Sequence, residues 1–180
     1  MAFVVAALVL LTLLCLFNLL ISLGLARRLR QHADLLSKQG APDQSLRAGD
    51  VVGDFAATTT EGEPVGRGLL AGHTLVAFLS PGCAPCKELM PEFEEYAARL
   101  PRSQVLAVVD AIDDLGAREY TDRLSPVARV VVEDPDGPMQ RAFKPEGFPA
   151  LYVVEDGGLV VAADRDLRRI RTLPESVYGA

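Results

Sequence analysis

The sequence has no tryptophan and, in 180 residues, only two histidines and three cysteines. A zinc site usually takes four ligands as two pairs, but this chain offers one close cysteine pair, Cys83 and Cys86. His32 and His73 are isolated, and the third cysteine, Cys15, lies in an apolar run. This shortage argues against zinc. It leaves a copper carrier built from Cys83, Cys86 and His73 as the only metal alternative.

Positive charge is also scarce, since 18 Lys and Arg face 24 Asp and Glu, for a net charge of −6. The basic residues gather only at residues 27–30 and 165–171, so the chain lacks the basic stripe that binds nucleic acid. We expect no nucleic-acid partner. The first group is suited to lipid phosphates. The second group, which includes Arg165, is assigned to a solvated face.

Charged residues are absent from residues 2–25. A helix of this length reaches about 36 Å at 1.5 Å per residue, and the core of a bilayer needs roughly 20 residues. A cleaved signal peptide is the alternative, but signal peptides begin with a positive region, and the first basic residue here is Arg27. The segment therefore predicts one N-terminal transmembrane helix that places residues 2–25 in the lipid bilayer.

The remaining chain divides into two parts. Residues 26–45 carry leucines at helical spacing followed by Gly40 and Pro42, which predicts a juxtamembrane helix and a linker. Residues 46–180 have the length of one globular domain. Their pattern predicts strands at 74–80, 103–110, 128–134, 150–156 and 159–164, helices at 83–99, 113–124 and 139–143, and a small hairpin turning at Glu61-Gly62. Strands that alternate with helices indicate an α/β fold with parallel strands, and the Asp156-Gly157 turn indicates an antiparallel hairpin at its end.

The two cysteines lie where a predicted strand meets a predicted helix. The helix N-terminus, with its dipole and free N–H groups, favours the thiolate of the first sulfur, which would be exposed. Residues i and i+3 are neighbours on a helix, so Cys86 can close a disulfide with Cys83. Attack by Cys83 on a substrate disulfide and resolution by Cys86 is a complete two-electron reaction that needs no cofactor.

Three motifs resemble thioredoxin-fold oxidoreductases, and more closely their membrane-tethered TlpA/ResA-like branch. They are Cys83-Ala84-Pro85-Cys86 after an apolar strand, Pro91 five residues past the second cysteine, and Pro149, which aligns with the family's cis-proline. Ser80-Pro81-Gly82-Cys83 also resembles the MauD-like accessory protein of methylamine dehydrogenase maturation. The resemblance implies a thioredoxin-like fold, a mixed sheet with flanking helices.

The same resemblance implies a function. It predicts a membrane-anchored thiol–disulfide oxidoreductase with Cys83 and Cys86 as catalytic residues, Phe148 and Pro149 as substrate-binding residues, and no cofactor or metal. Its partners would be protein thiol or disulfide substrates and a redox partner protein. The chain departs from the family at Ala77, where thioredoxins carry a buried Asp, and at Leu89, where the TlpA/ResA-like proteins carry a Glu. We also expect the terminal helix of the fold to be short or absent, because few residues follow the last predicted strand.

Two other functions fit parts of the sequence. A peroxiredoxin-like peroxidase would use Ser80 and Cys83, although Val76 stands where that family has a proline. A non-catalytic thioredoxin-fold chaperone or metal-binding module would hold a maturing protein or metal without turnover.

Two arguments disagree about the side of the membrane. The arginines at 27–30 follow the apolar segment, and by charge bias alone they would keep the domain in the cytoplasm. Disulfides persist outside the cytoplasm, and the families that this chain resembles work there. We expect a single-pass protein of the cell membrane with an extracytoplasmic catalytic domain.

Overall fold

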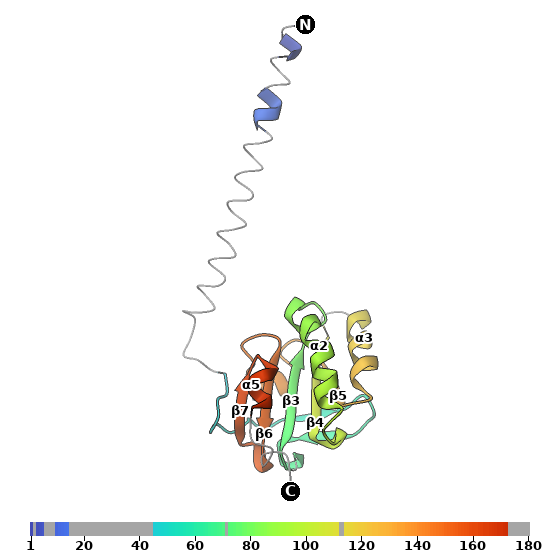
Figure 1. Cartoon of the computed structure of the whole chain (residues 1–180), viewed down its shortest axis with the longest axis vertical. Coiled ribbons are helices and arrows are strands. Elements are labelled where there is room, and N and C mark those ends of the chain that lie inside the picture. The colour runs from blue at the N-terminus through green and yellow to red at the C-terminus, as the bar shows by residue number, and fades with distance from the viewer. Residues whose placement is uncertain (2, 6–9, 15–44, 71, 112–113, 173–180) are drawn as a thin grey trace. The chain divides into compact units, whose positions relative to one another are not determined.

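The computed structural model describes residues 1, 3–5, 10–14, 45–70, 72–111 and 114–172 (Figure 1). The chain divides into two units, Met1–Asp43 and Gln44–Ala180. In the first unit, residues 3–5 and 10–14 are helical. None of the helices that the structure describes is long and apolar enough to cross a bilayer. Most of the transmembrane helix predicted at 2–25, and residues 26–44 of the juxtamembrane segment, lie outside the described residues.

The second unit is built on a five-stranded mixed sheet with the strand order β5-β4-β3-β6-β7. Its strands are β3 (Thr74–Leu79), β4 (Val105–Asp110), β5 (Arg129–Glu133), β6 (Ala150–Val154) and β7 (Val160–Asp164). β3, β4 and β5 are parallel, whereas β6 runs antiparallel to both β3 and β7. Every residue of β3 and β4 is buried, as expected for continuous apolar strands covered on both faces.

Helices cover both faces of this sheet. α2 (Ala84–Ala97), α3 (Asp114–Leu124) and α5 (Leu167–Arg171) lie on the near face in Figure 1. The other face is covered by α4 (Pro138–Phe143), the hairpin of β1 (Ala56–Thr58) and β2 (Pro64–Gly66), and the chain that precedes the hairpin. Alternate residues of β3 serve the two cores: Leu75, Ala77 and Leu79 face α2, whereas Val76 and Phe78 join the second cluster. The predicted α/β architecture is confirmed.

Most element boundaries agree with the sequence pattern, and the differences have local causes. β4 begins at Val105 rather than 103, because Arg102–Gln104 form a 3-10 turn, η2. The β6–β7 connection is the 3-10 turn η3 (Asp156–Gly158), in which Gly157 has φ 76°. Glycine adopts this left-handed conformation at little cost, which explains the Asp-Gly signal in the sequence. α5 is short, as predicted.

Candidate active site

Cys83 is the N-cap residue of α2. Its backbone N–H donates to the carbonyl of Ser80 at 3.0 Å, which closes the turn after β3. Its sulfur accepts the N–H of Cys86 at 3.2 Å, and Pro85 occupies the first turn, where a missing N–H costs nothing. The local sequence therefore holds the Cys83 sulfur at the helix N-terminus, as predicted, but the residue is half-buried rather than exposed.

Cys86 lies one turn deeper and is fully buried. Burial, together with the hydrogen bond to Cys83, raises the pKa of the Cys86 thiol to about 12. Both cysteines are free thiols. The two sulfurs thus differ in access, since Cys83 is half-buried and Cys86 is fully buried.

The second half of the site comes from a segment 65 residues further along the chain. The Cys83 thiol donates to the carbonyl oxygen of Phe148 at 3.2 Å. The Phe148–Pro149 peptide bond is cis. The structure therefore brings together the four residues that the sequence predicted as catalytic or substrate-binding, Cys83, Cys86, Phe148 and Pro149, although it does not by itself assign their roles.

Arg165 is exposed, as predicted for a solvated position, but its guanidinium also binds the backbone of the Phe148–Pro149 segment, which the sequence does not predict. Its Nη2 donates to the Phe148 carbonyl at 2.9 Å, and its Nε donates to the Pro149 carbonyl at 3.3 Å. The guanidinium also lies over Gly147, where an added Cβ would be 3.5 Å from Nη2. These partners are backbone atoms 16 and 17 residues away, so no sequence pattern reports them. The other predicted solvated arginines, at 168, 169 and 171, are exposed.

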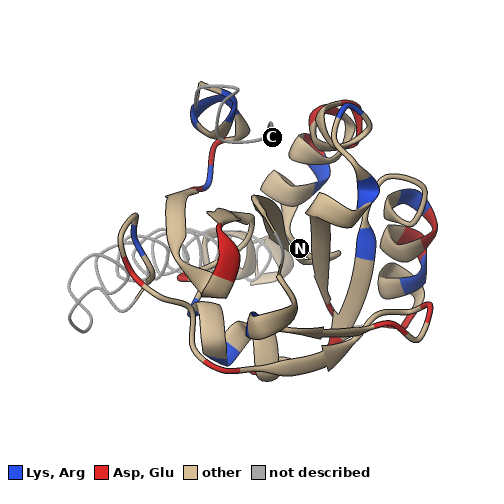
Figure 2. Cartoon of the chain, turned by 90° about the horizontal axis from the view of Figure 1, so that it is seen from below, with Lys and Arg blue, Asp and Glu red and all other residues tan. Residues whose placement is uncertain are grey.

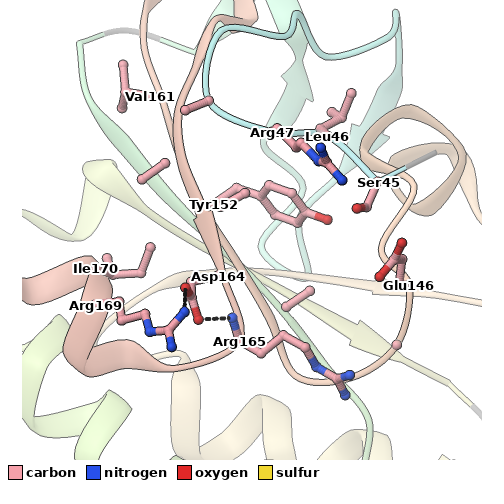
Figure 3. Close-up of a pocket in the computed structure, with 15 residues that line it drawn as sticks. Ser45, Leu46, Arg47, Glu146, Tyr152, Val161, Asp164, Arg165, Arg169 and Ile170 are labelled. Atoms are coloured by element: carbon pink, nitrogen blue, oxygen red, sulfur yellow. Dashed lines mark hydrogen bonds and ion pairs between the residues drawn. The ribbon is translucent and has the colours of Figure 1, made fainter. Parts of the chain in front are cut away.

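A groove and a cavity flank Arg165. The groove, about 410 Å³ in volume, lies between α2 and the start of α5 and is lined by Pro85, Glu88, Leu89, Glu92, Pro149, Arg165, Asp166 and Arg168. The cavity, about 520 Å³, lies on the other side, and Figure 3 shows Tyr152 and Asp164 at its wall. The groove adjoins the cysteine helix through Pro85, Glu88 and Leu89.

Proton-handling groups at the cysteines are few. Ala77 is buried where thioredoxins have an acid, and Glu88 is exposed on the groove. Tyr120 of α3, which sequence reasoning placed only in a helix, is 2% exposed and shares a core cluster with Cys86. Its hydroxyl has no hydrogen-bond partner within the described part of the chain. Burial is the main cause that raises the pKa of Tyr120 to about 12, and the nearby Cys86 and Cys83 sulfurs add to the rise when they are ionised.

The copper alternative required His73 beside the cysteines. His73 instead pairs with Glu155 at 2.8 Å, at the start of β3. The cysteines follow the other end of that strand, about 20 Å away at 3.3 Å per residue. Among the described residues, no three His, Cys, Asp or Glu side chains are grouped to hold a metal ion.

Charge does not divide the second unit into one basic and one acidic face. Figure 2 shows Lys and Arg together with Asp and Glu on α2 and α3. Several of these residues pair across elements, as in the two-pronged contact between Arg123 of α3 and Glu94 of α2, at 2.8 and 3.0 Å.

Comparison with known proteins agrees with this architecture. A sequence profile of the family described as Thioredoxin matches residues 69–122, from just before β3 into α3. A search of curated proteins finds no significant match to the chain.

Solved structures extend the similarity to most of the chain. The thioredoxin domain of a thiol-disulfide oxidoreductase from Bacteroides vulgatus superposes with a TM-score of 0.61 at 18% identity, covering 75% of this chain and all of that one. A thiol:disulfide interchange protein from a Bacteroides species gives 0.61 at 19% identity, covering 76% and 94%. A thio-disulfide isomerase from Thermus thermophilus gives 0.59 at 24% identity, covering 75% and 99%. The fold is therefore thioredoxin-like, and these neighbours are thiol–disulfide enzymes.

Proposed function

We propose that this thioredoxin-fold chain is a membrane-anchored thiol–disulfide oxidoreductase. In this proposal it exchanges disulfides with protein substrates through Cys83 and Cys86, takes its electrons from or passes them to a redox partner protein, and needs no cofactor. The observation that carries the proposal is the position of the Cys83 sulfur. It lies between the first-turn N–H of Cys86 and the Phe148 carbonyl, and the neighbouring residues Pro85 and Pro149 line a groove beside it.

The reaction would proceed in two steps. The Cys83 thiol loses its proton and the thiolate attacks a substrate disulfide, so that one S–S bond breaks, a mixed disulfide forms and the leaving sulfur takes up a proton. Cys86 then loses its proton and attacks the Cys83 sulfur, which releases the second substrate thiol and leaves the Cys83–Cys86 disulfide. Two electrons pass to the substrate. The reverse sequence oxidises a substrate dithiol.

The burial of Cys86 keeps its thiol from reacting before Cys83 has attacked the substrate. Because the Cys86 pKa is raised to about 12, the resolving thiol stays protonated while Cys83 attacks. Once a mixed disulfide has formed, Cys86 is the neighbouring nucleophile at i+3, so proximity offsets its low acidity. The proton that Cys86 must lose has no buried carboxylate acceptor at position 77, which is Ala.

A trapping experiment tests the proposal. The full-length chain, kept in detergent because of its apolar N-terminal segment, should reduce insulin in the presence of dithiothreitol. Cys86→Ser, reduced and then freed of dithiothreitol, should accumulate a mixed disulfide with insulin through Cys83, because no second thiol is present to release the substrate. Cys83→Ser is the matched control and should trap nothing. Trapping by Cys83→Ser would reverse the roles. Insulin binding that survives loss of both cysteines would indicate a chaperone, and peroxide consumption a peroxidase.

The location is proposed separately. We infer that residues 2–25 anchor the protein in the cell membrane and that the catalytic domain lies outside the cytoplasm. We also propose that the chain is close to the MauD-like group, because Ser80-Pro81-Gly82-Cys83 resembles the motif of that group. The test of the location is to replace Cys83 and Cys86 by Ser and introduce Leu115→Cys, at a position that is 80% exposed. Intact cells should label with a membrane-impermeant maleimide. Labelling only after lysis would place the domain in the cytoplasm.

A further inference from the structure

Arg165 is an exposed arginine whose guanidinium is held by the backbone of another segment. It follows β7 directly, in a turn organised by Asp164, whose Oδ1 accepts the N–H groups of Arg165 at 2.7 Å and Asp166 at 2.9 Å. Asp166 in turn caps α5 through the N–H of Arg168. The base of the Arg165 side chain is therefore fixed by local hydrogen bonds. In Figure 3 the side chain extends from this turn beside the loop that carries Glu146.

The Phe148 and Pro149 carbonyls belong to consecutive residues. One side chain can donate to both only if it carries two N–H groups in a fork, as arginine does. Nε and Nη2 of one guanidinium reach the Pro149 and Phe148 oxygens together. A lysine has one compact ammonium group and cannot reproduce this geometry. An exposed arginine gives up side-chain entropy to make such bonds, so its contribution to folding is small. What the two bonds do fix is the position of the Phe148 carbonyl.

That carbonyl is shared with the attacking cysteine. A carbonyl oxygen has two lone pairs. In the reduced protein the Phe148 oxygen accepts from the Cys83 thiol and from Arg165. When Cys83 enters a mixed disulfide it has no proton to donate, so one lone pair becomes available to an N–H of the bound polypeptide. Arg165 meanwhile keeps the oxygen in place.

We propose that Arg165 is a positioning residue that holds the Phe148 carbonyl beside Cys83 as a docking point for the substrate backbone, and so favours polypeptide disulfides over small ones. This role rests on the proposed oxidoreductase function. A polypeptide can use the docking point because its backbone carries N–H donors next to the cysteine. A small disulfide without amide groups reacts at the Cys83 sulfur alone.

The test compares two disulfides with one set of full-length variants. Insulin is the polypeptide substrate, and neutral 2-hydroxyethyl disulfide is the small one. Arg165→Gln should raise the KM for insulin about tenfold, with kcat and the second-order rate constant for the small disulfide changed less than twofold. Arg165→Lys, which keeps the charge without the fork, should give an intermediate KM.

Arg141→Lys is the matched control, because this arginine also donates to a backbone carbonyl, that of Asp136, on the opposite face of the sheet. Arg141→Lys should leave the KM for insulin and the rate constant for the small disulfide unchanged. Circular dichroism melting checks the fold of each variant, and if Arg165→Gln is unfolded, Arg165→Lys decides.

Equal losses with insulin and the small disulfide, or an unchanged KM, would overturn the positioning role alone. A wild-type chain inert toward both disulfides would overturn the oxidoreductase function, and the Arg165 role with it.

Discussion

The two walls of the site are assembled in different ways. The cysteine wall, residues 80–90, is made by neighbours in sequence: Ser80 binds Cys83, and Cys83 binds Cys86, each three residues apart. The corner wall, residues 146–150 with 164–168, joins segments that are 16 and 17 residues apart through the Arg165 side chain. The first wall is thus encoded locally. The second depends on the completed sheet, which places the end of β7 beside the start of β6.

The walls also differ in burial. The cysteine wall continues into the core through Cys86 and Met90, both fully buried, so its geometry is backed by close packing. The corner wall has an exposed arginine and lies between the groove and the cavity. We therefore expect changes in the cysteine wall to affect chemistry, and changes in the corner wall to affect substrate handling and stability by smaller amounts.

The largest predicted effect is the difference in alkylation rate between the two thiols of the cysteine wall. In the reduced native chain at pH 8, iodoacetamide should modify Cys83 about a hundredfold faster than Cys86, because Cys86 is fully buried and burial raises its pKa to about 12. Timed quenching and peptide mass mapping measure both rates. In denaturant the two rates should converge. Equal rates in the native chain would contradict the assignment of Cys86 as the protected, resolving thiol.

Much of the cysteine wall could be predicted from sequence. The apolar run at 74–80, the Pro81-Gly82 turn and the helical spacing of Leu89 and Phe93 together locate the strand end and the helix start, and the structure places Cys83 at the N-cap. Pro149 and Phe148 were found by resemblance to a family rather than by pattern. The hydrogen bond between Cys83 and the Phe148 carbonyl joins positions 65 residues apart, so no local pattern reports it.

The corner wall could not be predicted in full, for physical reasons. Arg165 lies in an arginine-rich stretch, which is typical of a solvated helix, and its partners are carbonyls that every residue possesses. Tyr120 has the spacing of a core residue, and nothing in the sequence reports that its hydroxyl lacks a partner near the cysteines. Strand order was also open, because alternation predicts parallel strands without saying that β4 lies between β3 and β5.

Replacing Phe148 tests whether the corner wall contributes to the stability of the fold as well as to substrate docking. The half-buried Phe148 ring packs against both core clusters. Phe148→Ala should lower the free energy of unfolding by about 2 kcal/mol and change the KM for insulin. Phe55→Ala is the control, because Phe55 is also half-buried but packs only in the second cluster, 5.7 Å from the Phe143 ring. It should cost similar stability at constant KM. An unchanged KM in both variants would remove Phe148 from the docking surface.

Asp164 holds the turn from which Arg165 extends. Burial opposes its ionisation, but the N–H groups of Asp166 and Arg165 and the Arg169 guanidinium outweigh burial and lower the Asp164 pKa. A lowered pKa means that the carboxylate stabilises the fold above the ordinary value of about 4, and that this stability is lost as the pH falls through the folded-state pKa.

Asp164→Asn should therefore cost about 1 kcal/mol at pH 7, and the difference from wild type should shrink below about pH 4. Urea unfolding at several pH values, followed by circular dichroism, measures it. Asp122→Asn, at an exposed position of α3, controls for the loss of one charge. A difference that grows toward low pH would contradict the assigned direction of the pKa shift.

The smallest effect concerns the one ion pair that links α5 directly to α2 in the described residues. Arg171 Nη1 lies 3.2 Å from Glu92 Oε1, and the Arg171 guanidinium carbon lies 5.8 Å from the centre of the Tyr96 ring. Both charged side chains are more than a third exposed, so solvent screens their attraction. A double-mutant cycle with Glu92→Gln and Arg171→Gln should give a coupling energy of about 0.3 kcal/mol.

The salt dependence of the Glu92–Arg171 coupling energy distinguishes a weak, solvent-screened ion pair from a rigid connection. At 1 M NaCl the Debye length is about 3 Å, so the Glu92–Arg171 coupling should fall toward zero while the Tyr96 contact remains. A coupling above about 1 kcal/mol that persists in salt would mean that α2 and α5 are fixed to each other across the groove. A weak, salt-sensitive coupling means that the groove can adjust its width to different polypeptides at little cost in free energy. Substrate selection would then depend on the Phe148 docking point rather than on a fixed groove width.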